Sequence, residues 1–274
     1  MNLVIPARPA PSTPSLPRKL ARRLIASDLR LLVRVVRRNL DDRHNRIRFA
    51  FEKAGSEDYP AEICSYRRAL VDYPGQEQSA AAKRLNQKIL ASYLNDTLIQ
   101  PGETFSIWHL APRPSSRHGY GEAAALRGRE LIMEVGGAIC LLSTVLYSVA
   151  LLGGLRIVER HCHSIDWYGP LRYFDLGRDA AIEYGFRDLR FSNPHPFPVL
   201  LRIEQDTASI TARLQAAEAP GFEVEIVASA PELRSFDNGE SAILVRSTRI
   251  QRSASGEVMT EKLPDTLHRQ RPLL

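Results

Sequence analysis

Cys140 is the residue whose position in this sequence most favours chemistry. It follows Gly136-Gly137 and begins an apolar segment, residues 139–152, that predicts a helix. A thiol at the start of a helix lies near unpaired amide donors and the positive end of the helix dipole, and both favour the thiolate. The alternative is a small buried residue, inert because an apolar environment keeps a thiol protonated.

Two histidines follow Cys140 at a spacing that suits this chemistry. The strand-like run 155–158 leads directly into His161, Cys162 and His163. Alternate side chains of a strand share a face, so we expect the two histidines on one side and Cys162 on the other. A cysteine packed against a histidine, with a third polar group orienting the ring, is the arrangement that nucleophilic cysteine enzymes use.

Three acidic residues are candidates for the orienting group: Asp166, Asp179 and Asp188. The His-x-His pattern also suits a metal, but two imidazoles fall short of the three or four ligands that zinc needs. We therefore expect no metal and no cofactor.

The segment around Cys140 must be buried to position these groups. Residues 135–155 are uncharged, which by length alone permits a transmembrane helix. Glycine pairs bracket the segment, however, and leave a helix of roughly 21 Å, whereas a bilayer needs about 30 Å. We interpret it as a core helix.

The remaining pattern predicts helices early and strands late. Residues 79–98 predict an amphipathic helix with Leu85, Ile89, Tyr93 and Leu94 on its apolar face. Strands are expected at 199–203, 209–214 and 222–227, and a closing hairpin at 243–251 and 257–263 around Ser255-Gly256. The fold class is α+β, with the cysteine-bearing helix packed on antiparallel strands and a β-rich C-terminal part. We expect three parts: residues 1–50, 51–215 and 216–274.

The N-terminal arm carries the basic charge. Residues 1–50 hold twelve Lys and Arg against three Asp, so the remaining 224 residues sum to −3 of the net +6. Five prolines in the first seventeen residues predict an extended or disordered lead-in, and arginines interrupt the apolar run that a secretory signal requires. Residues 18–39 predict one helix, or two joined near Ser27.

Three roles remain open for this helix: docking on the domain, lying on an anionic membrane, or binding nucleic acid. No aromatic residues are interleaved to stack on bases, so we expect membrane contact and no nucleic acid. Three cysteines, Cys64, Cys140 and Cys162, cannot all pair and so indicate a reducing compartment or a reactive thiol. The expected location is the cytoplasm, peripheral at the inner membrane face.

Five blocks in one order resemble the VanW family. They are NDTLIQPGETFSIW at 95–108, GY at 119–120, VGGAICLLSTVLY at 135–147, LRIVERHCHS at 155–164 and GRDAAIEYGFRDLRFSN at 177–193. The resemblance covers about residues 80–215. It implies a cell-wall role, either as an accessory protein of glycopeptide resistance or as a cysteine-dependent L,D-transpeptidase acting on peptidoglycan stem peptides.

The resemblance also implies a set of site residues. Cys140 is the nucleophile and His163 the base, with His161 in support. From the three candidate carboxylates named above, we place Asp179 in the catalytic set. The expected substrate-binding residues are Gly136, Gly137, Ala138, Ser143, Ser164 and Arg178, where amides near Gly137–Cys140 bind the developing oxyanion.

This chain departs from the family pattern at two positions beside the cysteine. Ala138 replaces a third glycine, in a turn that needs a positive φ, and Leu141 replaces a glutamine.

Overall fold

The computed structural model describes residues 16–128, 130–236 and 240–270, the side chains of residues 16–27 excepted. The chain divides into two compact units, one ending at Arg46 and the other beginning at Ile47. The first unit contains α1 (Leu16–His44), one continuous helix that confirms the predicted basic helix. The predicted proline-rich lead-in falls almost wholly outside the described residues.

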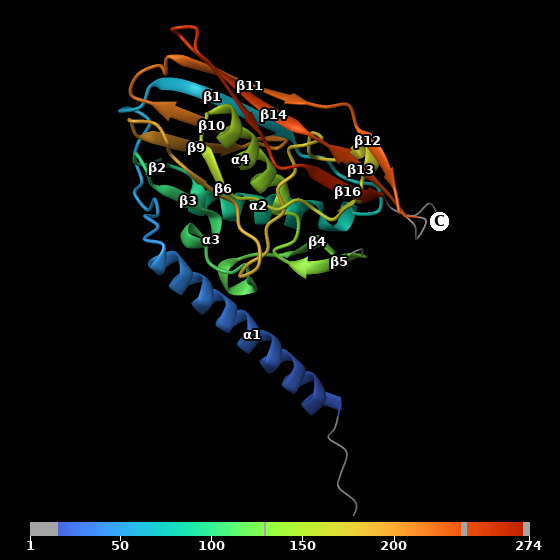
Figure 1. The fold of residues 1–274 in the computed structure, drawn as a ribbon. Coiled ribbons are helices and arrows are strands. Elements are labelled where there is room, and N and C mark those ends of the chain that lie inside the picture. Colours follow the sequence, from blue (N-terminus) through green and yellow to red (C-terminus); the bar gives the residue numbers. More distant parts are fainter. Residues whose placement is uncertain (1–15, 129, 237–239, 271–274) are drawn as a thin grey trace, which may run out of the picture. The chain divides into compact units, whose positions relative to one another are not determined.

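A four-stranded antiparallel sheet forms the centre of the second unit (Figure 1). Its strands, in spatial order, are β1 (Ala61–Ala69), β10 (Ser209–Ala216), β9 (Val199–Gln205) and β2 (Thr97–Ile99). β9 and β10 are the predicted strand pair. Alternation along β10 buries Ala212 and Leu214 in the core and directs Arg213 to the opposite face.

α4 (Cys140–Leu152) is the predicted core helix and packs against β1 and β10. Every residue from Leu141 to Leu151 is buried. Burying one large aliphatic side chain contributes about 1.5–3 kcal/mol, so this helix anchors the core. Among the described helices, none is both long and apolar enough to span a membrane.

α2 (Ala80–Leu94) confirms the second predicted helix. Of its predicted apolar face, Leu94 is buried, Ile89 and Tyr93 pack against the core, and Leu85 alone is misplaced. Leu85 is exposed, whereas the polar Asn86 and Gln87 are buried beside Leu90 and Leu94. The reason is that Asn86 and Gln87 bind backbone carbonyls of the loop before Cys140, which outweighs hydrophobicity as a guide to the buried side.

Smaller sheets and short helices surround this centre. One sheet contains β3 (Thr104–Ser106), β8 (Arg190–Ser192) and β6 (Arg156–Glu159), and a hairpin joins β4 (Glu122–Arg127) to β5 (Glu130–Val135). The short helices are α3 (Ile107–Leu110), η1 (Glu77–Ser79), η2 (Ser116–His118) and η3 (Gly169–Leu171).

The C-terminal part forms two further sheets. The first contains β11 (Phe222–Ala228), β14 (Ser247–Ser253) and β15 (Val258–Lys262). The second contains β12 (Glu232–Ser235), β13 (Ser241–Val245), β16 (Thr266–Gln270) and β7 (Ile165–Asp166). The predicted hairpin is β14–β15, turning at Gly256 with φ 85°. It does not close the chain, because β16 continues beyond it and pairs in parallel with β7. The α+β fold class is confirmed.

Candidate functional site

Cys140 lies at the first turn of α4. The amides of Leu142 and Ser143 bind the carbonyl of Ile139, which fixes the start of the helix. The thiol is partly exposed, and its Sγ lies 3.7 Å from the carbonyl oxygen of Ile182. The predicted placement of the thiol at a helix N-terminus is therefore what the structure shows.

The turn before Cys140 is held by close packing and by α2. A Cβ on Gly137 would lie 2.1 Å from the backbone oxygen of Ala123, so only glycine fits there. Asn86 donates to the carbonyl of Gly137 at 3.0 Å, and Gln87 donates to that of Ala138 at 2.9 Å. Ala138 adopts φ 67°, the positive angle expected for this turn. The backbone that leads into Cys140 is thus fixed on both sides.

His163 and Asp179 form a buried pair. The ring Nδ1 of His163 lies 2.8 Å from Oδ1 of Asp179, and the backbone amide of His163 donates to Oδ2 at 2.6 Å. The Asp179 side chain is fully buried and that of His163 is 12% exposed. A carboxylate only accepts, so Nδ1 carries the proton and Nε2 remains available for proton transfer.

The electrostatics of this pair favour a charged imidazole. Burial lowers the pKa of His163, but the Asp179 carboxylate and the Cys140 sulfur outweigh it and leave the pKa well above its ordinary value. Burial likewise raises the pKa of Asp179, but His163 and His268 reverse this and hold it well below its usual range. The Cys140 sulfur thus acts electrostatically on His163, while the hydrogen bonds to Asp179 hold the His163 ring in place.

Three tyrosines pack in a row that begins beside His163. The hydroxyl of Tyr173 lies 3.4 Å from Nε2 of His163, and Tyr173 packs edge-on against Tyr168, which stacks on Tyr73. Burial, followed by the charge of Cys140, raises the pKa of Tyr173 well above its ordinary value. Tyr173 therefore stays protonated and can donate a hydrogen bond.

Several predicted site residues lie elsewhere. His161 and His163 both lie beyond the end of β6 at Glu159, so strand alternation does not relate them. Nε2 of His161 lies 3.0 Å from Oε1 of Glu159, whereas His163 contacts Asp179. Ser143 is buried and donates to the carbonyl of Ala180 at 2.6 Å, which fixes the segment carrying Asp179. These two residues have structural partners.

The other predicted substrate-binding residues either lie in the turn before Cys140 or make contacts of their own. Ser164 is exposed, and its carbonyl accepts from the amide of Arg269. Arg178 lies over the ring of Tyr66 and 3.9 Å from Asp175. Gly136, with φ 83°, shapes the turn together with Gly137 and Ala138.

The three candidate orienting carboxylates are separated by their partners. Asp166 binds Arg172 at 2.6 Å, and Asp188 binds Ser106 at 2.6 Å and Arg190 at 2.9 Å. Of the three, Asp179 is the one that contacts His163.

His268 is a site residue that the sequence analysis missed. It lies on β16, is fully buried, and places Nε2 2.9 Å from Oδ2 of Asp179. The alternation of buried Thr266 and His268 along β16 marks a strand face, but nothing in the sequence indicates which residue that face meets.

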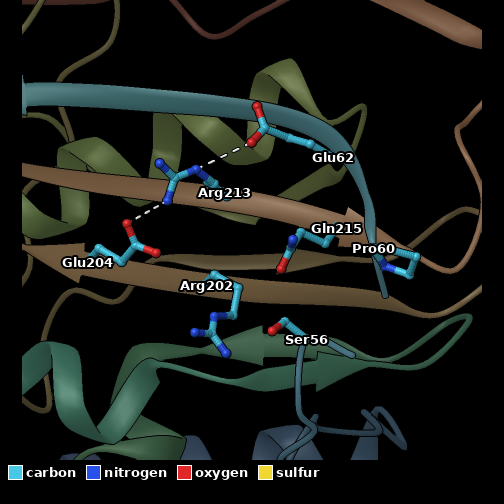
Figure 2. Close-up of a pocket in the computed structure, with 7 residues that line it drawn as sticks. All are labelled: Ser56, Pro60, Glu62, Arg202, Glu204, Arg213 and Gln215. Carbon is cyan, nitrogen blue, oxygen red and sulfur yellow. Dashed lines mark hydrogen bonds and ion pairs between the residues drawn. The ribbon is translucent and has the colours of Figure 1, made fainter. Parts of the chain in front are cut away.

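A concave region lies on the outer face of the central sheet (Figure 2). This groove has a volume of about 390 Å³ and is lined by Ser56, Pro60, Glu62, Arg202, Glu204, Arg213 and Gln215. Arg213 pairs with Glu204 at 2.6 Å and Glu62 at 3.3 Å, as Figure 2 shows, and Arg202 pairs with Asp96 at 2.7 Å. Both arginines of the groove are already paired with carboxylates, and its lining residues include neither a cysteine nor a histidine.

The fold and the site together describe an α+β domain that carries a cysteine at a helix start and a buried His–Asp pair. Residues 82–215 match the family model described as VanW like protein, and the chain belongs to the VanW family through this region. The five sequence blocks all lie within the matched region.

Two curated relatives share this region. The chain is 29% identical over 146 residues to "Uncharacterized protein YoaR" of Bacillus subtilis, covering 53% of this chain and 47% of the relative. It is 30% identical over 139 residues to "Vancomycin B-type resistance protein VanW" of Enterococcus faecalis, covering 50% of each. The chain thus spans about half the length of these relatives. No solved structure matches it.

Proposed function

We propose that this protein is a cysteine acyltransferase of the L,D-transpeptidase type, acting on peptidoglycan stem peptides. The observation that carries the proposal is the hydrogen-bonded pair of His163 and the fully buried Asp179 carboxylate, which together with the Cys140 sulfur favours a charged imidazole. The cell-wall substrate is supported by the family and by the name of its vancomycin-resistance relative.

The proposed reaction has two halves. The Cys140 thiolate adds to the carbonyl carbon of a peptide amide; the C–N bond then breaks, and His163 gives its proton to the departing amine. An acceptor amine next attacks the thioester and yields a proton to His163, and the C–S bond breaks to regenerate the thiolate. The amides of Gly136 and Gly137 already donate to backbone carbonyls, so the oxyanion formed in each half is assigned to the amides that follow Gly137.

Alkylation of Cys140 across pH 4 to 10 tests the nucleophile. An internal control exists, because burial raises the pKa of the Cys64 thiol to about 12, so Cys64 should react slowly in the same sample. We expect rapid labelling of Cys140 with a midpoint below about 8.5, lost in His163→Ala. Labelling that requires denaturant would contradict the proposal.

The substrate is tested by mass spectrometry of the intact protein mixed with peptidoglycan stem peptides. We expect a mass increase equal to the acyl fragment on Cys140, discharged by an added amine and absent from Cys140→Ser. An activated thiol that forms no adduct with any stem peptide would refute the substrate while leaving the nucleophile.

A non-catalytic accessory or binding role is the second candidate. One observation favours it: Leu141, beside the thiol, is 7% exposed and offers no side-chain donor to an oxyanion. In that case the same site holds a cell-wall precursor without cleaving it. Stem-peptide binding that survives Cys140→Ala, with no adduct in the wild type, would distinguish this role.

Membrane attachment through α1 is proposed separately. Leu29, Leu32, Val33, Val36 and Leu40 are exposed and recur at helical spacing, so they form one apolar stripe. Arginines such as Arg30 and Arg37 lie between them, which suits the inner, anionic face of a membrane.

Flotation of the full chain with anionic vesicles tests this attachment. We expect Leu32→Asp with Val36→Asp to abolish flotation, whereas Leu233→Asp, at an apolar position 63% exposed in the second unit, should not. Equal flotation of all three proteins would refute the role of α1.

A further inference from the structure

His268 lies outside residues 82–215, the part that matches the family, yet it reaches the centre of the candidate site. Its Nε2 is 2.9 Å from Oδ2 of Asp179, and both side chains are fully buried. Because an ionised carboxylate only accepts, His268 donates this hydrogen bond. Asp179 is therefore held between two imidazole rings, His163 on one side and His268 on the other.

A carboxylate buried this completely depends on its donors. Asp179 receives the ring and the amide of His163 and the ring of His268. Hydrogen bonds to charged groups are stronger than neutral ones, and a buried charge that loses a donor bears the cost of desolvation. Without His268, the carboxylate is free to turn from His163 or to take up a proton.

The surroundings of His268 fix its position. Phe174 stacks on its ring with centroids 4.9 Å apart. Arg160 donates to the carbonyl of Asp179 at 2.7 Å and to the hydroxyl of Thr266 on β16 at 2.8 Å, which ties the strand to the aspartate. β16 also pairs with β7, which directly follows the segment carrying His163.

We propose that His268 is a positioning residue that completes the Cys140–His163–Asp179 site, so the functional unit extends to the C-terminal strand β16. This inference rests on the proposed function, because it takes Cys140 as the nucleophile that His163 and Asp179 activate. It also assigns a role to the C-terminal sheet, which the family match does not cover.

The experiment compares full-length variants at position 268 by the rate and pH midpoint of Cys140 alkylation. His268→Leu removes the donor, and we expect labelling at pH 7 to fall about tenfold and the midpoint to rise by about one unit. His268→Gln keeps an amide donor near Nε2 and should restore most of the rate. The charged and titratable groups facing this pair, Arg160, Tyr173 and Cys140, are unchanged in both variants.

Arg269→Gln is the matched control, because Arg269 is on the same strand but pairs with Glu240 at the surface. It should label as the wild type does. If His268→Leu fails to fold, His268→Asn replaces it, since its shorter amide falls short of Asp179 while remaining polar. Equal midpoints in the wild type, His268→Gln and the donor-lacking variant would overturn the inference.

A further readout separates this inference from the proposed function. Wild-type Cys140 that is not activated refutes the proposed function alone. The inference is then judged by the ring resonances of His163 in an NMR titration, which need no nucleophile. A lower His163 pKa in His268→Leu but not in His268→Gln supports the positioning role, and an unchanged titration refutes it.

Discussion

The candidate site and the groove on the outer face of the sheet both bring opposite charges together, but in different environments. In the site, Asp179 is fully buried and its partner His163 is 12% exposed. In the groove, Arg213 is 33% exposed and Glu204 is 58% exposed. Water screens the pair in the groove and not the pair in the site, so contacts of similar length differ in electrostatic strength. A buried charge therefore shifts the pKa of its neighbours more than an exposed charge in a similar ion pair does.

The largest effect is expected from Asp179→Asn. The amide keeps the shape but loses the charge that favours the imidazolium, so labelling of Cys140 at neutral pH should fall roughly a hundredfold. Rates are measured with iodoacetamide in the Cys64→Ser, Cys162→Ser background. A rate within twofold of the wild type would contradict this prediction, because the buried charge of Asp179 would then have no effect on the reactivity of Cys140.

The second prediction concerns alkaline pH. The folded-state pKa of His163 is raised, so its contribution to stability is complete below the unfolded value of about 6.5 and is lost as pH rises through the folded pKa. Urea unfolding should show the free energy of unfolding declining above about pH 6.5 in the wild type. In His163→Gln this part of the decline should be absent; the same decline in both proteins would assign it elsewhere.

Ala138→Gly should have a smaller effect, on stability alone. Ala138 has φ 67°, which costs an L-residue about 1–2 kcal/mol, while glycine loses more chain entropy on folding. We expect a net gain of about 0.5–1 kcal/mol in thermal or urea unfolding, with labelling of Cys140 unchanged. Slower labelling would show that the strained turn also positions the thiol.

The smallest effect is expected from Arg213→Gln in the groove. Exposed ion pairs contribute about 0–1 kcal/mol, and the loss should shrink further in high salt. Labelling of Cys140 should match the wild type, since Arg213 is on the sheet face opposite the core. A loss of more than about 2 kcal/mol in the free energy of unfolding would mean that the ion pair in the groove matters as much as the buried pair in the site.

The sequence predicted the parts of the fold that depend on local pattern. Glycine pairs and an uncharged run located α4, period-two alternation located β11, and short strand-like runs located β9 and β10. Cys140 was found from its position at the start of a predicted helix, and His163 was chosen as the base through the family resemblance. Asp179 was placed in the catalytic set from among three carboxylates, and it is its contact with His163 that separates it from the other two.

What the sequence could not provide depends on contacts between distant segments. Leu85 was wrongly placed on the buried face of α2, and Asn86 and Gln87 were missed there, because these two polar residues are buried to bind a loop some fifty residues away. His161 was grouped with His163 because strand alternation was extended past Glu159, where β6 ends. His268 was missed because the contact that gives it meaning spans 89 residues.

The pairing of β16 with β7 has a consequence for how the protein matures. Arg269 aligns with Ile165 in parallel, so the two strands meet only after the residues between them have been synthesised. Contacts between such distant segments form late, because closing a long loop is entropically costly. A chain still emerging from the ribosome, or one truncated before residue 266, would thus hold a thiol and a histidine without the second imidazole on Asp179. Chemical competence would come as one of the last events of folding.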